Sequence, residues 1–269
     1  MTIIQPLDRD LLRQQYRTAQ PFPFIKVDNF LDPAMAADIA SSFPSFDKAA
    51  GQGKSFNSVN EKKKIQITNS SLFPKSIAKL HAALASTAFL ADLSYITNIP
   101  NLLADEELIG GGIHITGPGG RLDVHVDFNF LEDRRLHRRL NILVYLNPVW
   151  DERWGGHIQL WDRHVEECLQ QFAPVLNRCV IFETSETSFH GVVPVTPEAP
   201  FPRQSFAGYY YTREAPQGWD GKAHSTMFKA RPAERLKGYV LMPAERVSHH
   251  LTENTRRVKR GIKRLLVKT

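Results

Sequence analysis

The chain has 269 residues, of which 42% are hydrophobic and 23% charged, the composition of an ordinary globular protein with a sizeable core. No stretch approaches the roughly 18 consecutive apolar residues of a membrane-spanning helix, and the first residues lack the features of a secretory signal. The two cysteines, Cys168 and Cys179, are too few for a disulfide framework, so we expect a cytoplasmic protein with both thiols reduced.

The formal net charge of +6 is concentrated at the C-terminus. Residues 256–269 contain seven lysines and arginines and no acidic residue, so they account for all of the excess positive charge. Val258, Ile262 and Leu265 recur there at helical spacing, which predicts a short amphipathic basic helix. Two interpretations stay open: a solvated helix resting on the domain, or a contact with an acidic partner, a membrane surface or nucleic acid.

The first 107 residues are predicted to be mainly helical. The pattern predicts helices over 8–20, from 33 onward and twice between 74 and 100, and short strands within 21–33 and at 65–68. Asp32 followed by Pro33 is a typical helix start, with a capping carboxylate and a first-turn proline. Residues 47–64, rich in Lys, Gly, Ser and Asn, are expected to form a polar loop. His81 falls on an apolar helix face and is expected to be a packing residue.

From residue 108 to about residue 212, short β-branched or aromatic runs alternate with turn signals, which predicts a sandwich or barrel. The glycines of this region form neither a dinucleotide fingerprint nor a phosphate-binding loop, and no nucleophile elbow occurs. We therefore expect a single domain, with 1–107 as helical support, 108–212 as the β core and 213–269 as a C-terminal helical region with the basic tail.

A candidate metal site begins with His125 and Asp127, which are one residue apart in a strand-like run. Since residues i and i+2 of a strand point to the same face, an imidazole and a carboxylate emerge side by side. His190 follows after several further strand-like runs, and Arg203 comes shortly after it. Two histidines and one carboxylate are the ligand set of non-haem Fe(II) oxygenases.

These runs resemble the prolyl-4-hydroxylase-like branch of the Fe(II)/2-oxoglutarate-dependent dioxygenases. The resemblance covers residues 108–212 and rests on YLNPVW, the GG-led strand, NRCVIFETSETSFH and RQS, a pattern similar to ribosomal-protein prolyl hydroxylases and to a bacterial group of 2-oxoglutarate/Fe(II) oxygenases. It implies a mainly β protein, a double-stranded β-helix (distorted jelly roll) packed against N-terminal helices. It also implies Fe(II) held by His125, Asp127 and His190, and the co-substrates 2-oxoglutarate and O₂.

The resemblance places the grip on the distal carboxylate of 2-oxoglutarate at Arg203, whose planar fork suits a carboxylate. Ser205 lies on the same strand face and can add a hydroxyl donor. The family's tyrosine falls on Tyr145, strand alternation places Asn141 on the same face, and Ile158 is expected to supply an apolar wall.

The implied reaction hydroxylates an unactivated C–H bond and releases succinate and CO₂. Asp127 favours hydroxylation, because related halogenases carry Gly or Ala at this position. Arg138, His114 and His157 are candidates for contact with the substrate. The substrate stays open between peptidyl proline, an amino acid and another small metabolite.

Two other classes of protein fit the sequence less well. Nucleic-acid demethylases of the same superfamily carry a second arginine six residues after the 2-oxoglutarate arginine, where this chain has Tyr209. A non-catalytic jelly-roll binding module would have no reason to keep both the metal ligands and Arg203. A rival pair, His164 and Glu166, stands in a polar stretch and is interpreted as part of a charged loop or helix. We therefore expect a small-molecule or peptidyl substrate rather than nucleic acid.

Overall fold

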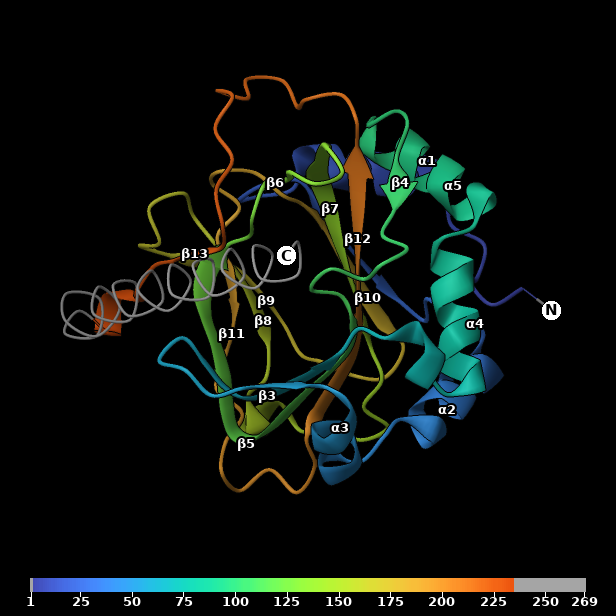
Figure 1. The fold of residues 1–269 in the computed structure, drawn as a ribbon, viewed down its shortest axis with the longest axis vertical. Helices are drawn as coiled ribbons and strands as arrows, with labels where there is room; N and C mark the ends of the chain where they lie inside the picture. The colour runs from blue at the N-terminus through green and yellow to red at the C-terminus, as the bar shows by residue number, and fades with distance from the viewer. Residues whose placement is uncertain (1, 235–269) are drawn as a thin grey trace, which may run out of the picture.

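The computed structural model describes residues 2–234, so the predicted basic helix around Val258, Ile262 and Leu265 lies outside the described residues (Figure 1). In chain order the elements are α1 (Arg9–Thr18), β1 (Phe24–Asp28), α2 (Pro33–Ser42), α3 (Phe46–Gln52), β2 (Lys54–Phe56), β3 (Glu61–Ile67), the 3-10 turn η1 (Ser70–Leu72), α4 (Lys75–Leu84), α5 (Thr87–Thr97), β4 (Leu103–Ala104), β5 (Gly112–Val126), β6 (Phe130–Leu131), β7 (Leu136–Tyr145), η2 (Glu152–Trp154), β8 (Ile158–Trp161), β9 (Cys168–Phe172), β10 (Arg178–Glu183), β11 (His190–Val192), β12 (Arg203–Thr212), β13 (Met227–Phe228) and η3 (Pro232–Glu234).

The strands of the described part form one curled antiparallel sheet of 13 strands, whose main path is β1-β10-β7-β12-β5-β11-β8-β9. The long strand β5 takes part in two regions of the curl. Near Ile113 it pairs with β12 and β3, and near His125 it pairs with β11 and β13. The protein is therefore mainly β, and its curled sheet is the double-stranded β-helix, or distorted jelly roll, that the resemblance implies.

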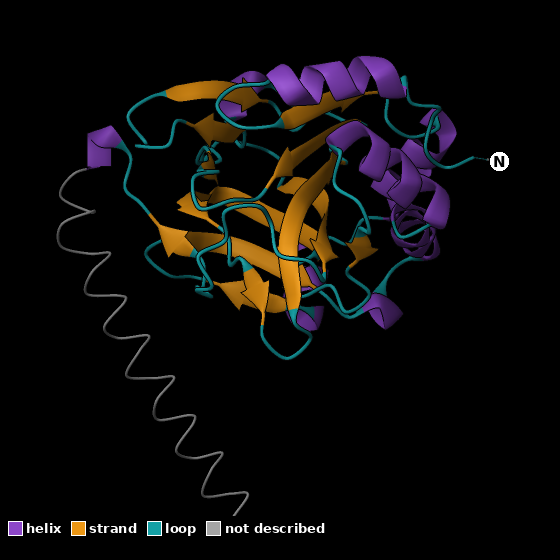
Figure 2. Ribbon diagram, turned by 90° about the horizontal axis from the view of Figure 1, so that it is seen from above, coloured by secondary structure: helices purple, strands orange, loops and turns teal. Residues whose placement is uncertain are grey.

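The N-terminal helices cover one outer face of this sheet, as Figures 1 and 2 show from two directions. Residues of β7 alternate between the two faces: Ile142 and Val144 join the core cluster that also contains Leu80 of α4 and Leu93 of α5. Each such fully buried aliphatic side chain contributes about 1.5–3 kcal/mol. The opposite face of β7, with Asn141, points into the interior of the curl, where the cavity described below lies.

The predicted start of α2 is confirmed. Oδ1 of Asp32 accepts hydrogen bonds from the backbone N–H of Ala34 (3.0 Å) and of Met35 (3.1 Å), and Pro33 occupies the first turn. These bonds satisfy two of the four free N–H groups at the helix start, so the short sequence signal was sufficient to define this boundary.

The polar loop expected at 47–64 is wrong. This segment forms most of α3, all of β2 and the first half of β3. Ser45 caps α3, since its Oγ accepts from the N–H of Lys48 (3.3 Å). The strand forms because Ile65 and Ile67 are buried against β5. Of the lysines that precede them, Lys62 and Lys63 are exposed, whereas Lys64 is largely buried and pairs with Glu61 (2.8 Å).

The region 213–234 also differs from the expected helical segment, because it contains only β13 and η3 besides irregular chain. Instead of a helix it forms a strap, which we define as residues 213–231, that runs back across β5. The polar, proline-punctuated sequence explains why this stretch lacks a helix.

Three smaller expectations are met among the described residues. His81 packs against the rings of Phe73 and Phe206, with ring centroids 6.1 Å and 6.0 Å apart, as expected of a packing histidine. Cys168 and Cys179 are both free thiols. Within residues 2–234, every helix is too short or too polar to cross a membrane.

Candidate metal centre and co-substrate pocket

Two histidines and one aspartate meet where β5 and β11 lie side by side. His125 is near the end of β5, Asp127 follows that strand directly, and His190 begins β11, where the register pairs it with His125. Nε2 of His125 lies 3.6 Å from Oδ1 of Asp127, and Nε2 of His190 lies 3.4 Å from Oδ2. One donor atom of each residue lies within 4.8 Å of the others, so the three can hold a metal ion between them.

Backbone carbonyls orient both imidazoles. Nδ1 of His125 lies 2.8 Å from the carbonyl oxygen of Asp123, and Nδ1 of His190 lies 2.9 Å from that of Ser188. A carbonyl oxygen only accepts, so Nδ1 carries the proton and Nε2 keeps its lone pair toward Asp127. Burial and the neighbouring His125 lower the pKa of His190, which favours the neutral, metal-binding form.

The carboxylate of Asp127 is buried among positive and polar partners. Oδ2 lies 3.1 Å from Nη2 of Arg138 and accepts a 2.7 Å hydrogen bond from Nδ2 of Asn141. Burial alone would raise the pKa of Asp127, but the charge of Arg138 holds it well below its usual range. The group therefore stays ionised, as a metal ligand must.

The three residues line a cavity of about 540 Å³ inside the curl of the sheet, which lies within the usual size range of ligand pockets. Its apolar wall is built by Leu108, Ile109, Leu122, Phe128, Leu143, Ile158, Phe182, Val192 and Phe228. Ile158 therefore lies where the sequence predicted an apolar wall.

A second charged group, Arg203 at the start of β12, lines the same cavity and is only 4% exposed. Its Nε donates to the carbonyl oxygen of Gly156 (2.8 Å) and its Nη1 to Oγ of Ser205 (3.2 Å). Burial lowers the pKa of Arg203, and no carboxylate of residues 2–234 lies within ion-pair distance of it. The cation is therefore positioned to receive an anionic ligand.

The GG-led turn before β8 brings the backbone close to this arginine. Gly156 has a φ of +70°, and a Cβ on it would lie 2.9 Å from the ring of Trp150 and 3.2 Å from Cδ of Arg203. Only glycine combines this backbone conformation with so close an approach. The second glycine of the motif therefore positions the carbonyl group that holds Nε of Arg203.

Tyr145 lies against Arg203, whose Cζ is 4.9 Å from the centroid of the tyrosine ring. The hydroxyl of Tyr145 is buried and close enough to Arg203 to interact with its charge, but it makes no hydrogen bond of normal geometry with a described residue. An unsatisfied buried hydroxyl is unusual, and an anion bound by Arg203 would satisfy it. Asn141 lies four residues before Tyr145 on the same strand. Its side chain instead contacts the metal end of the cavity, where it donates a hydrogen bond to Asp127.

The three candidates for substrate contact differ in their surroundings. Arg138 and His114 both line the cavity, whereas His157 does not. His157 directly precedes the first residue of β8 and is buried. Contact between His157 and a substrate therefore stays a prediction.

The sequence patterns did not indicate several of the residues that line the cavity. Two of them, Gln66 and Tyr209, lie near His114. Nε2 of His114 lies 3.0 Å from the carbonyl oxygen of Gly110 and 3.0 Å from Nε2 of Gln66, and the hydroxyl of Tyr209 donates to the same carbonyl (2.7 Å). Burial and the charge of Lys64 hold the pKa of His114 well below its usual range, so it is neutral. Alternation from Arg203 along β12 would have located Tyr209.

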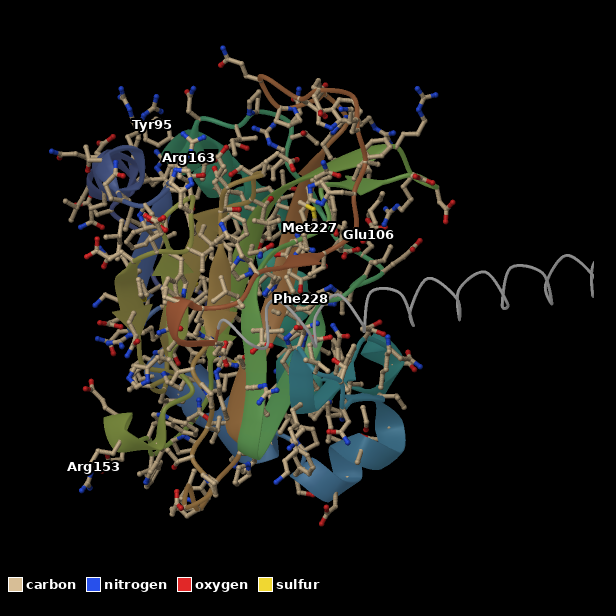
Figure 3. The ribbon with its side chains drawn as sticks, turned by 90° about the vertical axis from the view of Figure 1, so that its left-hand side faces the viewer. Tyr95, Glu106, Arg153, Arg163, Met227 and Phe228 are labelled. Atoms are coloured by element: carbon tan, nitrogen blue, oxygen red, sulfur yellow. The ribbon has the colours of Figure 1, made fainter. Side chains whose placement is uncertain are left out.

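The strap forms a further wall of the site, and no sequence signal indicated it. β13 pairs Phe228 with His125, and the two ring centroids are 5.3 Å apart. Arg231 secures the strap by donating to the carbonyl oxygen of Val192 (3.1 Å) and to Oδ1 of Asp123 (3.5 Å). Figure 3 views this face, with Phe228 near its centre and Arg153 far from it.

The comparisons with known proteins agree with this geometry. Residues 111–211 match the family model of the 2OG-Fe(II) oxygenase superfamily, so the β core is similar to that superfamily, which confirms the resemblance. Prolyl 3-hydroxylase OGFOD1 of Mus musculus is 34% identical over 84 residues, which are 30% of this chain and only 15% of that protein.

Two solved structures have the same fold at low sequence identity. A prolyl-4-hydroxylase of Pseudomonas putida is 18% identical, with a TM-score of 0.53, and the match covers 76% of this chain and all of that one. A Trichoplax adhaerens prolyl hydroxylase, in complex with a peptide of hypoxia inducible factor, is 16% identical, with a TM-score of 0.54, and the match covers 76% and 88% of the two chains.

Proposed function

We propose that the protein is an Fe(II)- and 2-oxoglutarate-dependent hydroxylase. One observation carries this proposal: a His-Asp-His cluster and a buried arginine without a carboxylate partner line one cavity. A simple metal-binding module would need only the cluster. A module that binds an organic acid would need only the arginine. A reaction that needs a bound metal and a bound small diacid uses both the cluster and the arginine.

In this proposal His125, Asp127 and His190 hold Fe(II). The donor set fits the metal, since it offers two neutral imidazole nitrogens and one ionised carboxylate. Bound together with 2-oxoglutarate, the iron would activate O₂ to oxidise a substrate C–H bond, with release of succinate and CO₂.

Arg203 and Ser205 would bind the distal carboxylate of 2-oxoglutarate. The hydroxyl of Tyr145 would then gain the hydrogen bond that it lacks among the described residues. Ile158 and the other apolar residues of the wall would keep water from the reacting atoms. Asn141 belongs to the metal end, because it holds Asp127.

We propose a peptidyl, prolyl-like substrate or a small metabolite rather than nucleic acid. The support is that the relatives named above are prolyl hydroxylases and that one was solved with a peptide. Against nucleic acid, the position of the demethylases' second arginine holds Tyr209, which is buried and stacked on Arg138.

We further propose that the chain forms a single domain, because strands from both its first and its last described segments join one sheet. A cytoplasmic location remains a proposal, as does an acidic partner for the basic tail.

The test is consumption of 2-oxoglutarate by the purified protein. With Fe(II) and O₂ we expect slow release of succinate even before a substrate is found, and we expect none from His125→Ala. The absence of succinate from a folded, iron-loaded wild-type protein, together with no measurable binding of 2-oxoglutarate, would contradict the proposal. A mass increase of about 16 in a candidate peptide or metabolite would identify the substrate.

A further inference from the structure

Arg138 is one of the most enclosed charged groups of the site. Only 3% of the residue is exposed. Its Nε donates to Oδ1 of Asn141 (3.0 Å), and its Nη2 both donates to that oxygen (2.8 Å) and lies 3.1 Å from Oδ2 of Asp127. Nδ2 of Asn141 closes the ring by donating to the same Oδ2 (2.7 Å). Three side chains therefore form a closed set of hydrogen bonds.

Two aromatic rings lie against the guanidinium group. Its Cζ lies 3.6 Å from the ring centroid of Tyr209 and 4.5 Å from that of Phe128. Such stacking holds the planar group in one orientation and leaves it little freedom to reach a substrate. A substrate anion at Arg138 would also take a partner from the buried carboxylate of Asp127.

The two oxygens of Asp127 consequently have different surroundings. Oδ2 is held by Arg138 and Asn141 and also lies 3.4 Å from Nε2 of His190, whereas Oδ1 lies 3.6 Å from Nε2 of His125 and is held by neither Arg138 nor Asn141. We propose that Arg138, acting with Asn141, is a positioning residue that holds Oδ2 of Asp127 and so presents Oδ1 to the metal. This inference rests on the proposed function, because it requires a metal at the three ligands.

This role replaces the substrate contact expected of Arg138 from the sequence, and the two roles predict different defects. A substrate-binding arginine can be removed without changing how the substrate-free protein binds a metal. A residue that holds a metal ligand cannot, because changes at such groups typically cost about 10–100-fold in metal affinity.

The experiment is titration calorimetry with Mn(II), which reports metal binding without turnover. Arg138→Met keeps the apolar stem but removes the fork, and we expect it to bind Mn(II) about tenfold or more weakly than the wild type. Arg138→Lys keeps the charge but cannot bridge Asp127 and Asn141 in the same way, so we expect an intermediate affinity. Circular dichroism would show that each variant is folded.

Arg139→Met is the matched control. Arg139 is the next residue of β7 and is also partly buried, but its side chain lies on the opposite face, where Nη1 donates to Oγ1 of Thr212 (3.3 Å). We expect this variant to keep its Mn(II) affinity within about twofold of the wild type, since it contacts no metal ligand.

The affinity for 2-oxoglutarate gives a second readout, because a general loosening of the fold would lower this affinity as well. In Mn(II)-saturated protein, Arg138→Met should bind 2-oxoglutarate nearly as well as the wild type, because Arg203 and Ser205 are unchanged. Should Arg138→Met fail to fold, Arg138→Lys and Asn141→Ala would decide the question by the same titrations.

Unchanged or tighter Mn(II) binding by folded Arg138→Met, or an equal loss in Arg139→Met, would overturn the inference. A wild-type protein that binds no Mn(II) at the site would instead contradict the proposed function itself. The two failures are therefore distinguishable in one set of titrations.

Discussion

At one end of the cavity the buried charge of Asp127 is matched by Arg138 and Asn141, whereas at the other end the buried charge of Arg203 faces no carboxylate of residues 2–234. The guanidinium of Arg203 is held by a carbonyl and a hydroxyl oxygen, which orient it without neutralising it. The metal end is thus built before any ligand arrives, while the other end needs an anion to be complete.

This difference has an energetic meaning. A paired buried charge is tolerated in a protein, and removing its partner typically destabilises the fold by about 3–5 kcal/mol. An unpaired buried charge already opposes folding, and a ligand that pairs with it recovers part of that free energy. The two ends should therefore respond in opposite ways to mutation and to ligand.

The largest expected effect is on metal binding. His190→Ala removes one of the three donors and should weaken Fe(II) or Mn(II) binding about a hundredfold or more, since two ligands rarely hold these metals well. Metal analysis after dialysis should find about one metal ion per chain in the wild type and almost none in the variant. Full metal content in folded His190→Ala would place the site elsewhere.

The next effect concerns the stability of the metal-free protein. Asp127→Asn leaves Arg138 with a buried, uncompensated charge and should lower the free energy of unfolding at pH 7 by about 2 kcal/mol or more. Arg203→Met removes a charge that has no carboxylate partner and should not lower it. Urea titration of both variants would measure the contrast, and equal destabilisation would show that the two ends are alike.

The same comparison has a pH dependence whose sign follows from Asp127. The folded-state pKa of this group is well below its usual value of about 3.9, so its contribution is present above that value and is lost as pH falls through the folded-state pKa. The difference in stability between wild type and Asp127→Asn should therefore shrink on acidification below about pH 4. A difference that grows on acidification would contradict the assigned ion pair.

At the opposite end, Arg203→Met should weaken binding of 2-oxoglutarate to the Mn(II)-loaded protein at least about tenfold, because it removes a charge-assisted contact to a carboxylate. The Mn(II) affinity itself should not change. Calorimetry would measure both quantities, and an unchanged affinity for 2-oxoglutarate would move the anion site away from Arg203.

The smallest effect is expected from Tyr145→Phe. Its hydroxyl is buried without a well-formed hydrogen bond, so its removal should leave the stability of the ligand-free protein unchanged or slightly higher. If the hydroxyl donates to bound 2-oxoglutarate, the affinity should fall about three- to tenfold, the typical value of one hydrogen bond. A loss of stability without ligand would instead show that the hydroxyl has a structural partner.

Much of the fold could be predicted from local signals. The cap at Asp32 and the strand alternation around Ile142 are properties of neighbouring residues, and both appear in the structure. The hairpin of β2 and β3 could not be predicted in this way, because its polar residues form strands only by pairing, β2 with β3 and β3 with the distant strand β5. The strap could not be predicted for the same reason, since β13 is a strand only because it pairs with β5.

The candidate site shows the same limit. Alternation correctly brought His125 and Asp127 to one face, but it says nothing about which partner binds each oxygen of the carboxylate. Arg138 was expected to face the substrate, yet it is enclosed by Tyr209 and Phe128, residues of two other segments. Contacts of this kind depend on the register between strands, which the alternation within a single strand does not specify.

The most direct measurement of the central claim is the affinity of 2-oxoglutarate for the protein with and without metal. A ligand held at both ends of the cavity should bind the Mn(II)-loaded protein at least about tenfold more tightly than the metal-free protein, by linkage between the two sites. Calorimetry should then give one Mn(II) and one 2-oxoglutarate per chain. Equal affinities in the presence and absence of metal would show that the two ends of the cavity do not serve one ligand.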